Sequence, residues 1–455
     1  MPLRRQLGLS AVLAIVVGDM IGSGIFFTPG ELAAVASSEW QVYFFWALCG
    51  VITLCGALTL AELATLLPQA GVSYHALTQA YGPFAGFMQA WIMILVSGPG
   101  AIAGIAVLFG EFATRLTGGE SEGMQLVWAA AAIVFFALIN LRGVQWGGRI
   151  QVVLTAVKVL GLLALVAGGL IFAEPHAGFA DAAETEQGGL LGMLRFVGLG
   201  VAIVLFTYDG WIDASNVAGE VKDPGRNFPL AMGVGVILIT AVYLLVNFAF
   251  LRVVPLDEMR SAPTQVAATV ATAAYGNGGG TALNLLMWIS IFGALGGLIM
   301  TLPRLFYAAA SEYVERARET VLSGPVRALA AVSGARAVPS GAILIAAGLS
   351  IAALLFFGSF SRIVTFFVVP FQLINILMVS SVFVLRPRLS GPGAFRVPGY
   401  PFTPAVFMLV MSSFLLAAVV YNPFDSMIGI ALTLTGIPVY RMLVRNSKEP
   451  GDDSL

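Results

Sequence analysis

The sequence predicts an all-α integral membrane protein with 12 transmembrane helices. Hydrophobic residues make up 58% of the 455 residues, and only 10% are charged, whereas a soluble domain carries about 25% charged residues. So much apolar surface cannot be buried inside one soluble core and needs lipid as its solvent. Apolar stretches of about 20 residues, the length that a spanning helix needs, also recur along the whole chain.

The expected spans occur at regular intervals and divide the chain into groups. They lie near 8–29, 40–66, 84–114, 124–142, 149–173, 191–217, 228–252, 281–309, 339–358, 361–385, 403–422 and 425–444. We expect residues 1–173 to form a first set of five helices and 191–388 a second set. Residues 402–445 would add two further helices, and 446–455 would be a disordered cytoplasmic tail, with no soluble domain at either end.

Basic residues give the orientation, because segments on the cytoplasmic side are enriched in Lys and Arg. If Arg4 and Arg5 are cytoplasmic, the inner segments hold 17 of the 23 Lys and Arg residues. An error of one helix would abolish this asymmetry, so it supports the count of twelve. We therefore expect a multi-pass protein of the cell (inner) membrane with both termini in the cytoplasm. The sequence leaves open the role of the charged inner segment 311–336.

Composition also argues against several classes of protein. The net charge of −1 predicts no bulk attraction to nucleic acid. Two histidines and two cysteines are too few and too scattered for a metal site. The sequence contains no nucleophile–base pair and no phosphate-binding loop, so we expect neither an enzyme nor an ATP-driven pump, and no cofactor. A membrane sensor that binds a ligand without moving it remains the alternative from another class.

The first span contains the sequence Gly22-Ser23-Gly24-Ile25-Phe26. Glycine weakens a helix by roughly 1 kcal/mol relative to alanine, and a broken helix persists in lipid only where its free backbone groups face protein, water or a ligand. The N–H groups that begin the second half suit a carboxylate, and the carbonyls that end the first half suit an ammonium group. Together they fit the zwitterionic head of an amino acid. The alternative is close helix packing through small residues.

The sixth span contains Phe206-Thr207-Tyr208-Asp209-Gly210-Trp211, and Asp209 with Gly210 in this apolar stretch predicts a second break. Interrupted segments at corresponding places in two halves mark the binding site of a transporter. Because the two breaks are five helices apart, we expect two five-helix repeats of opposite orientation. The alternative for Asp209 is a structural carboxylate that caps the broken helix.

Lys158 lies in the fifth span, roughly 13 Å from the cytoplasmic interface at 1.5 Å per residue. An ionisable residue inside the membrane is a candidate functional residue. Its ammonium group can lose a proton or replace a bound cation, and the alternative is that it extends to the interface. Further candidates, for a pocket that holds the substrate side chain, are Ser290, Gly293, Gln372 and Asn375.

These motifs, with Glu220-Val221-Lys222-Asp223-Pro224-Gly225-Arg226-Asn227-Phe228-Pro229, resemble the amino acid–polyamine–organocation (APC) superfamily. Within it, the chain is most similar to bacterial relatives of the L-type amino-acid transporters. The resemblance covers nearly the whole chain. It implies a LeuT-type fold, a 5+5 inverted repeat with helices 1 and 6 broken, plus two C-terminal helices.

The resemblance also implies a role for each motif residue. The substrate-binding residues would be Met20, Ile21, Gly22, Ser23, Gly24, Phe206, Asp209 and Gly210. N–H groups near Ser23 and Gly24 would hold the substrate carboxylate, and carbonyls of the two breaks would hold its amino group. The Phe206 ring would be the outer gate. Lys158 would occupy the place of sodium in sodium-coupled members, which implies sodium-independent transport.

The expected activity is therefore exchange of neutral L-amino acids by alternating access. The alternative is a proton-coupled symporter of amino acids or amines, with Lys158 as the titrating group. The chain departs from the family pattern after Arg304, where Ser311-Glu312-Tyr313 replaces the usual motif. The outer loop Thr117–Gly123 has no cysteine, so we expect no disulfide-linked heavy-chain subunit. The expected partners are amino-acid substrates and the lipid bilayer.

Overall fold

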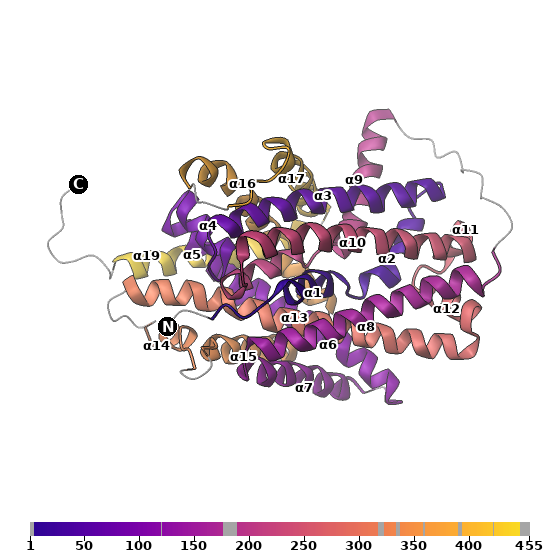
Figure 1. Cartoon of the computed structure of the whole chain (residues 1–455), viewed down its shortest axis with the longest axis horizontal. Coiled ribbons are helices and arrows are strands. Elements are labelled where there is room, and N and C mark those ends of the chain that lie inside the picture. Colours follow the sequence, from indigo (N-terminus) through magenta and orange to yellow (C-terminus); the bar gives the residue numbers. More distant parts are fainter. Residues whose placement is uncertain are drawn as a thin grey trace.

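The computed structural model describes residues 4–445 except 120, 176–188, 317–322, 334–336, 358–359, 390–393 and 422. The described residues form helices and loops, with two isolated β-bridges and no β-strand among them. The longer helices run along the longest axis of the molecule (Figure 1). The predicted all-α architecture is confirmed, and the predicted tail 446–455 lies outside the described residues.

The helices follow one another in chain order. They are α1 (Leu9–Met20), α2 (Gly24–Ala33), α3 (Glu39–Leu66), α4 (Val72–Tyr81), α5 (Pro83–Ile92), the π-helix η1 (Met93–Ser97), α6 (Gly98–Leu116), α7 (Glu122–Leu141), α8 (Val144–Ile171), α9 (Gly189–Thr207), the 3-10 helix η2 (Trp211–Glu220), α10 (Pro224–Val253), α11 (Leu256–Ser261), α12 (Val266–Tyr275), α13 (Asn277–Arg316), α14 (Ser323–Leu329), α15 (Ser340–Phe357), α16 (Phe360–Arg388), α17 (Phe402–Tyr421), α18 (Pro423–Leu434) and α19 (Gly436–Arg445).

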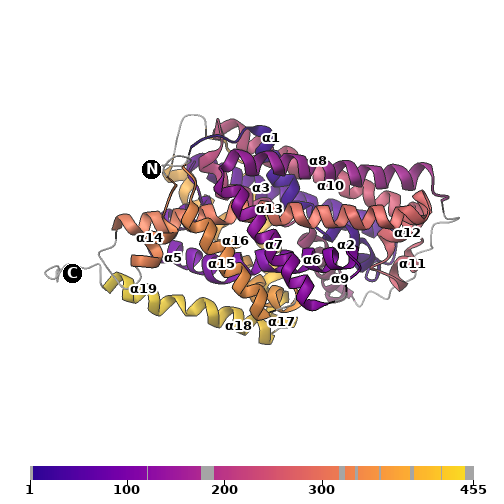
Figure 2. The same cartoon turned by 90° about the horizontal axis from the view of Figure 1, so that it is seen from below.

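Eight helical segments of the described chain are long and apolar enough to cross a membrane, and the bent pair α1 and α2 makes a ninth. Shorter apolar helices cover the predicted spans near 339–358, 403–422 and 425–444. The structure thus supports a membrane protein, and the count of twelve spans stays a prediction. The C-terminal helices α17, α18 and α19 lie along one side of the bundle (Figure 2).

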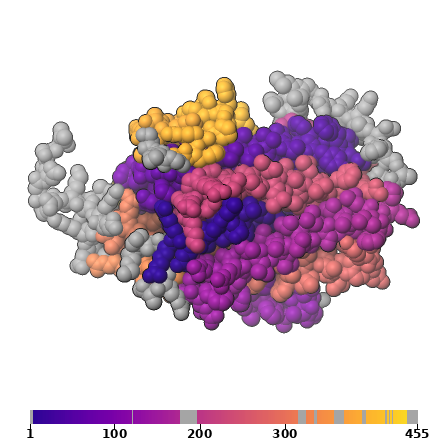
Figure 3. Space-filling model, in the orientation of Figure 1, coloured from indigo at the N-terminus to yellow at the C-terminus, as the bar shows by residue number. Residues whose placement is uncertain are grey.

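Helix α1 occupies the middle of the bundle. It lies between α10 and α8 on the face that Figure 3 shows. Val12, Ile15 and Val16 on this helix are fully buried. By contrast, large apolar side chains such as Trp40 and Ile171 are exposed on the outer surface, as expected for a protein whose solvent is lipid. A span this buried can be interrupted, because its neighbours supply hydrogen-bond partners.

Two buried carboxylates, Glu62 and Glu220, form hydrogen bonds and ion pairs at the ends of spans. Glu62, at the end of α3, accepts hydrogen bonds from the Val397 N–H at 2.7 Å and from Arg396 Nη1 at 3.0 Å. Glu220, at the end of η2, pairs with Arg304 of α13 at 2.7 Å, and both side chains are buried. A buried carboxylate without a partner is costly, so these pairs explain two charges that the sequence places at the ends of apolar stretches.

The segment that precedes α1 is hydrogen-bonded to the residues around Glu220. The N–H groups of Gln6 and Leu7 donate to the Glu220 carbonyl at 2.8 and 2.9 Å, and the Lys222 N–H donates to the Leu7 carbonyl at 2.8 Å. The segment before α1 is thereby hydrogen-bonded to the end of η2. Since α1 and η2 belong to the two interrupted spans, these bonds couple the two on one side of the bundle.

Candidate functional site

The first predicted break is confirmed. Helix α1 ends at Met20, α2 begins at Gly24, and the two axes differ by 42°. The Gly22 N–H donates to the Met20 carbonyl at 3.0 Å, which is a turn and not a helical bond. The backbone groups that the break frees therefore need partners from other helices.

The second predicted break is also present. Helix α9 ends at Thr207 and the 3-10 helix η2 begins at Trp211. Gly210 between them has φ 112°, a conformation that glycine adopts without strain. A Cβ at Gly210 would lie 2.7 Å from the backbone carbonyl oxygen of Asp19. Glycine is therefore required both for the turn and for the close approach of the two broken spans.

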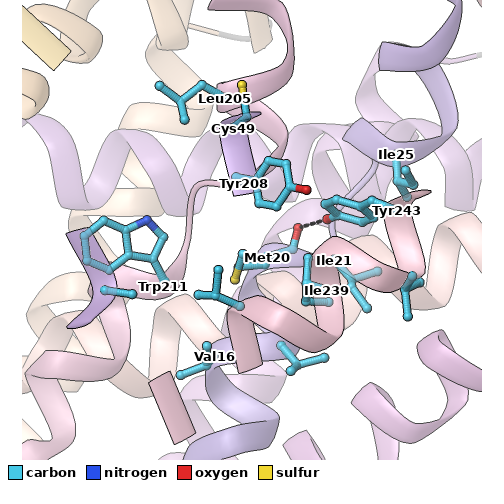
Figure 4. Packing of buried hydrophobic residues seen from close by; sticks show 14 of the residues in the cluster. Val16, Met20, Ile21, Ile25, Cys49, Leu205, Tyr208, Trp211, Ile239 and Tyr243 are labelled. Atoms are coloured by element: carbon cyan, nitrogen blue, oxygen red, sulfur yellow. Dashed lines mark hydrogen bonds between the residues drawn. The ribbon is translucent and has the colours of Figure 1, made fainter. Parts of the chain in front are cut away.

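One tyrosine, Tyr243, contacts the last residues of both α1 and α9, the helices that precede the two breaks. Tyr243 of α10 is buried, and its hydroxyl donates to the Met20 carbonyl at 2.8 Å (Figure 4). The same hydroxyl lies 3.2 Å from the Thr207 carbonyl. Its ring packs edge-on against Trp46 and Tyr208 at 5.1 and 5.2 Å. Sequence reasoning missed this residue. The only available signal was a hydroxyl-bearing aromatic residue inside a charge-free span.

Lys158 supports the first break directly. The side chain is buried, and Nζ donates to the carbonyls of Gly18 at 2.7 Å and Ile21 at 2.9 Å. These are carbonyls whose helical partners are displaced by the break. The alternative that Lys158 extends to the interface is thus wrong. Its ammonium group binds the backbone oxygens as a small cation would.

Two glycines of α13, Gly293 and Gly297, leave room for the side chains of Lys158 and Asp19. A Cβ at Gly293 would lie 2.5 Å from Lys158 Cε, and a Cβ at Gly297 would lie 1.6 Å from Asp19 Oδ1. Gln151 of α8 donates to the same Asp19 oxygen at 3.1 Å. The two glycines, one helical turn apart, therefore leave the space that the Lys158 and Asp19 side chains occupy.

A cavity of ≈ 160 Å³ opens where the two breaks meet. The predicted residues that line it are Met20, Gly22, Ser23, Gly24, Phe206, Asp209 and Gly210. Asp19, Thr207 and Asp213 line it as well, together with small residues of η1 and α6: Ser97, Gly100, Ala101 and Gly104. The cavity thus combines backbone ends, carboxylates and a wall of small side chains.

Of the residues predicted to contact the substrate, five do not line this cavity. The Ile21 carbonyl is directed to Lys158 and to Ser290, whose hydroxyl donates to the Ile21 and Gly22 carbonyls at 3.0 Å each. Ser290 and Gly293 therefore lie behind the first break. On α16 the lining residue is Phe371. Gln372 is absent from the lining because one step along a helix turns the side chain by about 100°, and Asn375, one helical turn beyond Phe371, does not line the cavity either.

Among the described residues, no group of three or more His, Cys, Asp or Glu side chains is placed to hold a metal ion. The groups that can bind a ligand in this cavity are therefore mainly backbone N–H and C=O groups. The cavity offers the N–H end of α2, the carbonyls that end α1 and α9, and the Asp209 carboxylate, whose Oδ1 accepts the Gly210 N–H at 2.9 Å. This combination can bind a small molecule that carries one negative and one positive group.

The close approach at Gly297 gives a first testable prediction. Gly297→Ala would place a methyl group on Asp19 Oδ1 and is expected to displace that carboxylate and the end of α1. We expect ligand binding by the purified protein to fall by about tenfold or more, as a misfit in a packed core costs about 1–3 kcal/mol. Gly278→Ala, on the same helix but with nothing within 4 Å, is the control and should bind normally. Equal binding by both variants would contradict this placement of Asp19.

Comparison with known proteins finds amino acid permeases, exchangers and transporters. The model of the amino acid permease family matches residues 7–442. The serine/threonine exchanger SteT of Bacillus subtilis (strain 168) is 31% identical over 444 residues, which cover 96% of each chain. The cystine/glutamate transporter of Homo sapiens is 27% identical over 98% of this chain and 87% of its own. The b(0,+)-type amino acid transporter 1 of Mus musculus is 28% identical over 97% and 88%.

Proposed function

The chain belongs to the amino acid permease family of the APC superfamily, and from this premise we propose that it is a sodium-independent exchanger of neutral L-amino acids. The observation that carries the proposal is the meeting of two interruptions, between α1 and α2 and between α9 and η2, at one cavity. A transporter uses such a site because unpaired backbone ends bind a zwitterion without a dedicated charged side chain for each group.

The substrate carboxylate would lie at the start of α2, against the N–H groups near Ser23 and Gly24. The hydrogen bonds of Lys158 indicate which oxygen atoms remain available to bind the substrate amino group. The Ile21 carbonyl already accepts hydrogen bonds from Lys158 and Ser290, so it has little capacity left for the substrate. The carbonyl of Phe206 and the carboxylate of Asp209, at the second break, are the better partners.

The proposed architecture is a LeuT-type bundle of twelve spans. Two inverted repeats would occupy residues 1–173 and 191–388, and two additional helices residues 402–445. The interrupted spans would rock against the rest of the bundle and expose the cavity to each side in turn. Phe206, which lines the cavity and is 54% exposed, would be the outer gate that closes over the substrate.

Sodium independence rests on Lys158. Its ammonium group, which binds the carbonyls of Gly18 and Ile21, would take the place of the sodium ion of sodium-coupled transporters. The second candidate function, proton-coupled symport of amino acids or amines with Lys158 as the titrating group, requires this residue to become neutral. Its two carbonyl acceptors at 2.7 and 2.9 Å stabilise the charged form instead, and they favour exchange.

We further propose that the protein lies in the cell (inner) membrane with both termini cytoplasmic and works without a disulfide-linked subunit. The two cysteines, Cys49 and Cys55, are free and lie within α3, and the loop Thr117–Gly123 contains no cysteine. Amino acids and lipid would be its partners.

Transport in liposomes tests the proposal. Purified protein is reconstituted, the vesicles are loaded with unlabelled serine or leucine, and uptake of the radiolabelled amino acid is followed with sodium or potassium outside. We expect rapid uptake into loaded vesicles, much slower uptake into empty ones at equal pH on both sides, and no effect of sodium. If no labelled amino acid enters under exchange, proton-gradient or sodium-gradient conditions, the proposed function is wrong.

A further inference from the structure

Three carboxylates line the cavity. Asp19 comes from α1, Asp209 from the second break and Asp213 from η2, and the lining contains no Lys or Arg among the described residues. The nearest buried cation is Lys158, which donates to backbone carbonyls and interacts electrostatically with Asp19. With all groups ionised, the cavity and Lys158 together would carry three negative charges and one positive charge.

The three carboxylates differ in how they are compensated. Asp209 accepts the Gly210 N–H, and Asp19 accepts a hydrogen bond from Gln151 and lies near Lys158. Asp213 is only 8% exposed. Its backbone N–H donates to the Gly210 carbonyl at 3.3 Å, but within the described chain its carboxylate has no hydrogen bond and no ion pair. Its charged neighbours are the carboxylates of Asp209 and Asp19.

Other charged groups on the surrounding helices do not compensate Asp213. Arg304 of α13 forms an ion pair with Glu220 at 2.7 Å. Lys158 of α8 is committed to two carbonyls. An uncompensated carboxylate costs several kcal/mol inside a protein or a membrane. A zwitterionic substrate brings no net charge, so the net negative charge of the site is the same after it binds, although its amino group lies beside Asp209.

We propose that Asp213 binds a proton that crosses the membrane together with the substrate. This inference rests on the proposed function and adds a coupling ion to it. A proton from the outer solution binds a carboxylate oxygen of Asp213 and gives the neutral acid, which relieves the repulsion from Asp209 and Asp19. When the cavity opens to the cytoplasm, water hydrates the carboxylate and the proton leaves.

Coupling of this kind is compatible with exchange. In exchange, protons move in both directions with the substrates and no gradient is consumed. In empty vesicles, an inward proton gradient drives net uptake. For one proton per substrate, a gradient of about two pH units supports about 100-fold accumulation, because each unit is worth about 1.36 kcal/mol.

The test uses the full chain in empty liposomes that contain a trapped pH-sensitive dye, with the outside more acidic than the inside. We expect labelled serine or leucine to accumulate above the outside concentration, and unlabelled substrate to carry protons inward. Asp213→Asn, which fixes the neutral form, should not accumulate substrate above the outside concentration. The exchange that it retains should no longer vary between acid and neutral pH.

Two control variants separate this effect from others. Asp257→Asn makes the same change at an exposed site and should keep the gradient-driven accumulation. Burial lowers the pKa of His75, on α4 outside the spans, below its ordinary value, and Glu312 opposes this shift. His75 therefore also titrates at acid pH, and His75→Gln should keep the pH dependence of the wild type.

The outcomes are distinct. Gradient-driven accumulation by Asp213→Asn at the wild-type level would overturn the inference. So would substrate uptake by the wild type without proton entry, a result that needs no variant to fold. Uptake of cationic amino acids that requires Asp213 but moves no protons would assign the carboxylate to the substrate instead. Absence of all amino-acid transport would refute the proposed function itself.

Discussion

Lys158→Ala is expected to reduce amino-acid exchange in liposomes by about 100-fold or more. The substitution removes two hydrogen bonds from a buried ammonium group, to the carbonyls of Gly18 and Ile21. Bonds to charged groups are worth about 1.5–3 kcal/mol each, and every 1.4 kcal/mol is a factor of ten. The loss also leaves Asp19 without its nearest positive charge. The break in the first span would then lose the partner that stabilises it.

A charge-conserving variant makes this prediction sharper. Lys158→Arg keeps the positive charge but needs more space, and a Cβ at Gly293 would already lie 2.8 Å from Lys158 Nζ. We expect this variant to be impaired as well, because the planar guanidinium cannot bind the two carbonyls in the same space. Arg149→Ala, an exposed position on the same helix, should exchange normally. Full exchange by Lys158→Ala would remove the role assigned to this residue.

Glu220→Gln is expected to cause the largest loss of stability. Glu220 and Arg304 form a buried pair at 2.7 Å, with side chains that are 2% and 0% exposed. Removal of one partner of a buried pair costs about 3–5 kcal/mol, because the other charge remains buried without compensation. The transition temperature of the purified protein in detergent should fall clearly. Glu111→Gln breaks a partly exposed pair with Arg115 and should cost about 1 kcal/mol or less.

A double variant separates the pair from its surroundings. If the cost arises from the unpaired arginine, Glu220→Gln combined with Arg304→Gln should be less destabilising than the sum of the two single changes. Additive effects would contradict this explanation. The backbone bonds of Gln6 and Leu7 to the Glu220 carbonyl remain possible in every variant, so they do not confuse the comparison.

The sequence predicts the breaks well because their causes are local. Gly22, Gly24 and Gly210 interrupt apolar stretches, and the structure ends or begins a helix within three residues of each. The burial of Lys158 also follows from its position along the span. These features depend on composition within a single helix, and such information is present in a short stretch of sequence.

The partners of these residues could not be predicted, because they depend on how the helices are rotated against one another. Tyr243 follows Met20 by 223 residues in the sequence and reaches it only because α10 packs against α1 in the folded protein. Nothing near Tyr243 in the sequence marks it as a support for both breaks. Ser290 and Gly293 were predicted to line the pocket for the substrate side chain, but Ser290 contacts the first break, Gly293 lies against Lys158, and neither lines the cavity. Phe371 lines the cavity in place of its neighbour Gln372.

The central claim is that an amino acid binds where the two interrupted spans meet, and an experimental density map of the protein with serine or leucine bound tests it most directly. We expect the substrate carboxylate at the start of α2 near Ser23 and Gly24, and its amino group beside Asp209. An unbroken helix through Ser23 or through Asp209, or an amino acid bound away from this cavity, would contradict it.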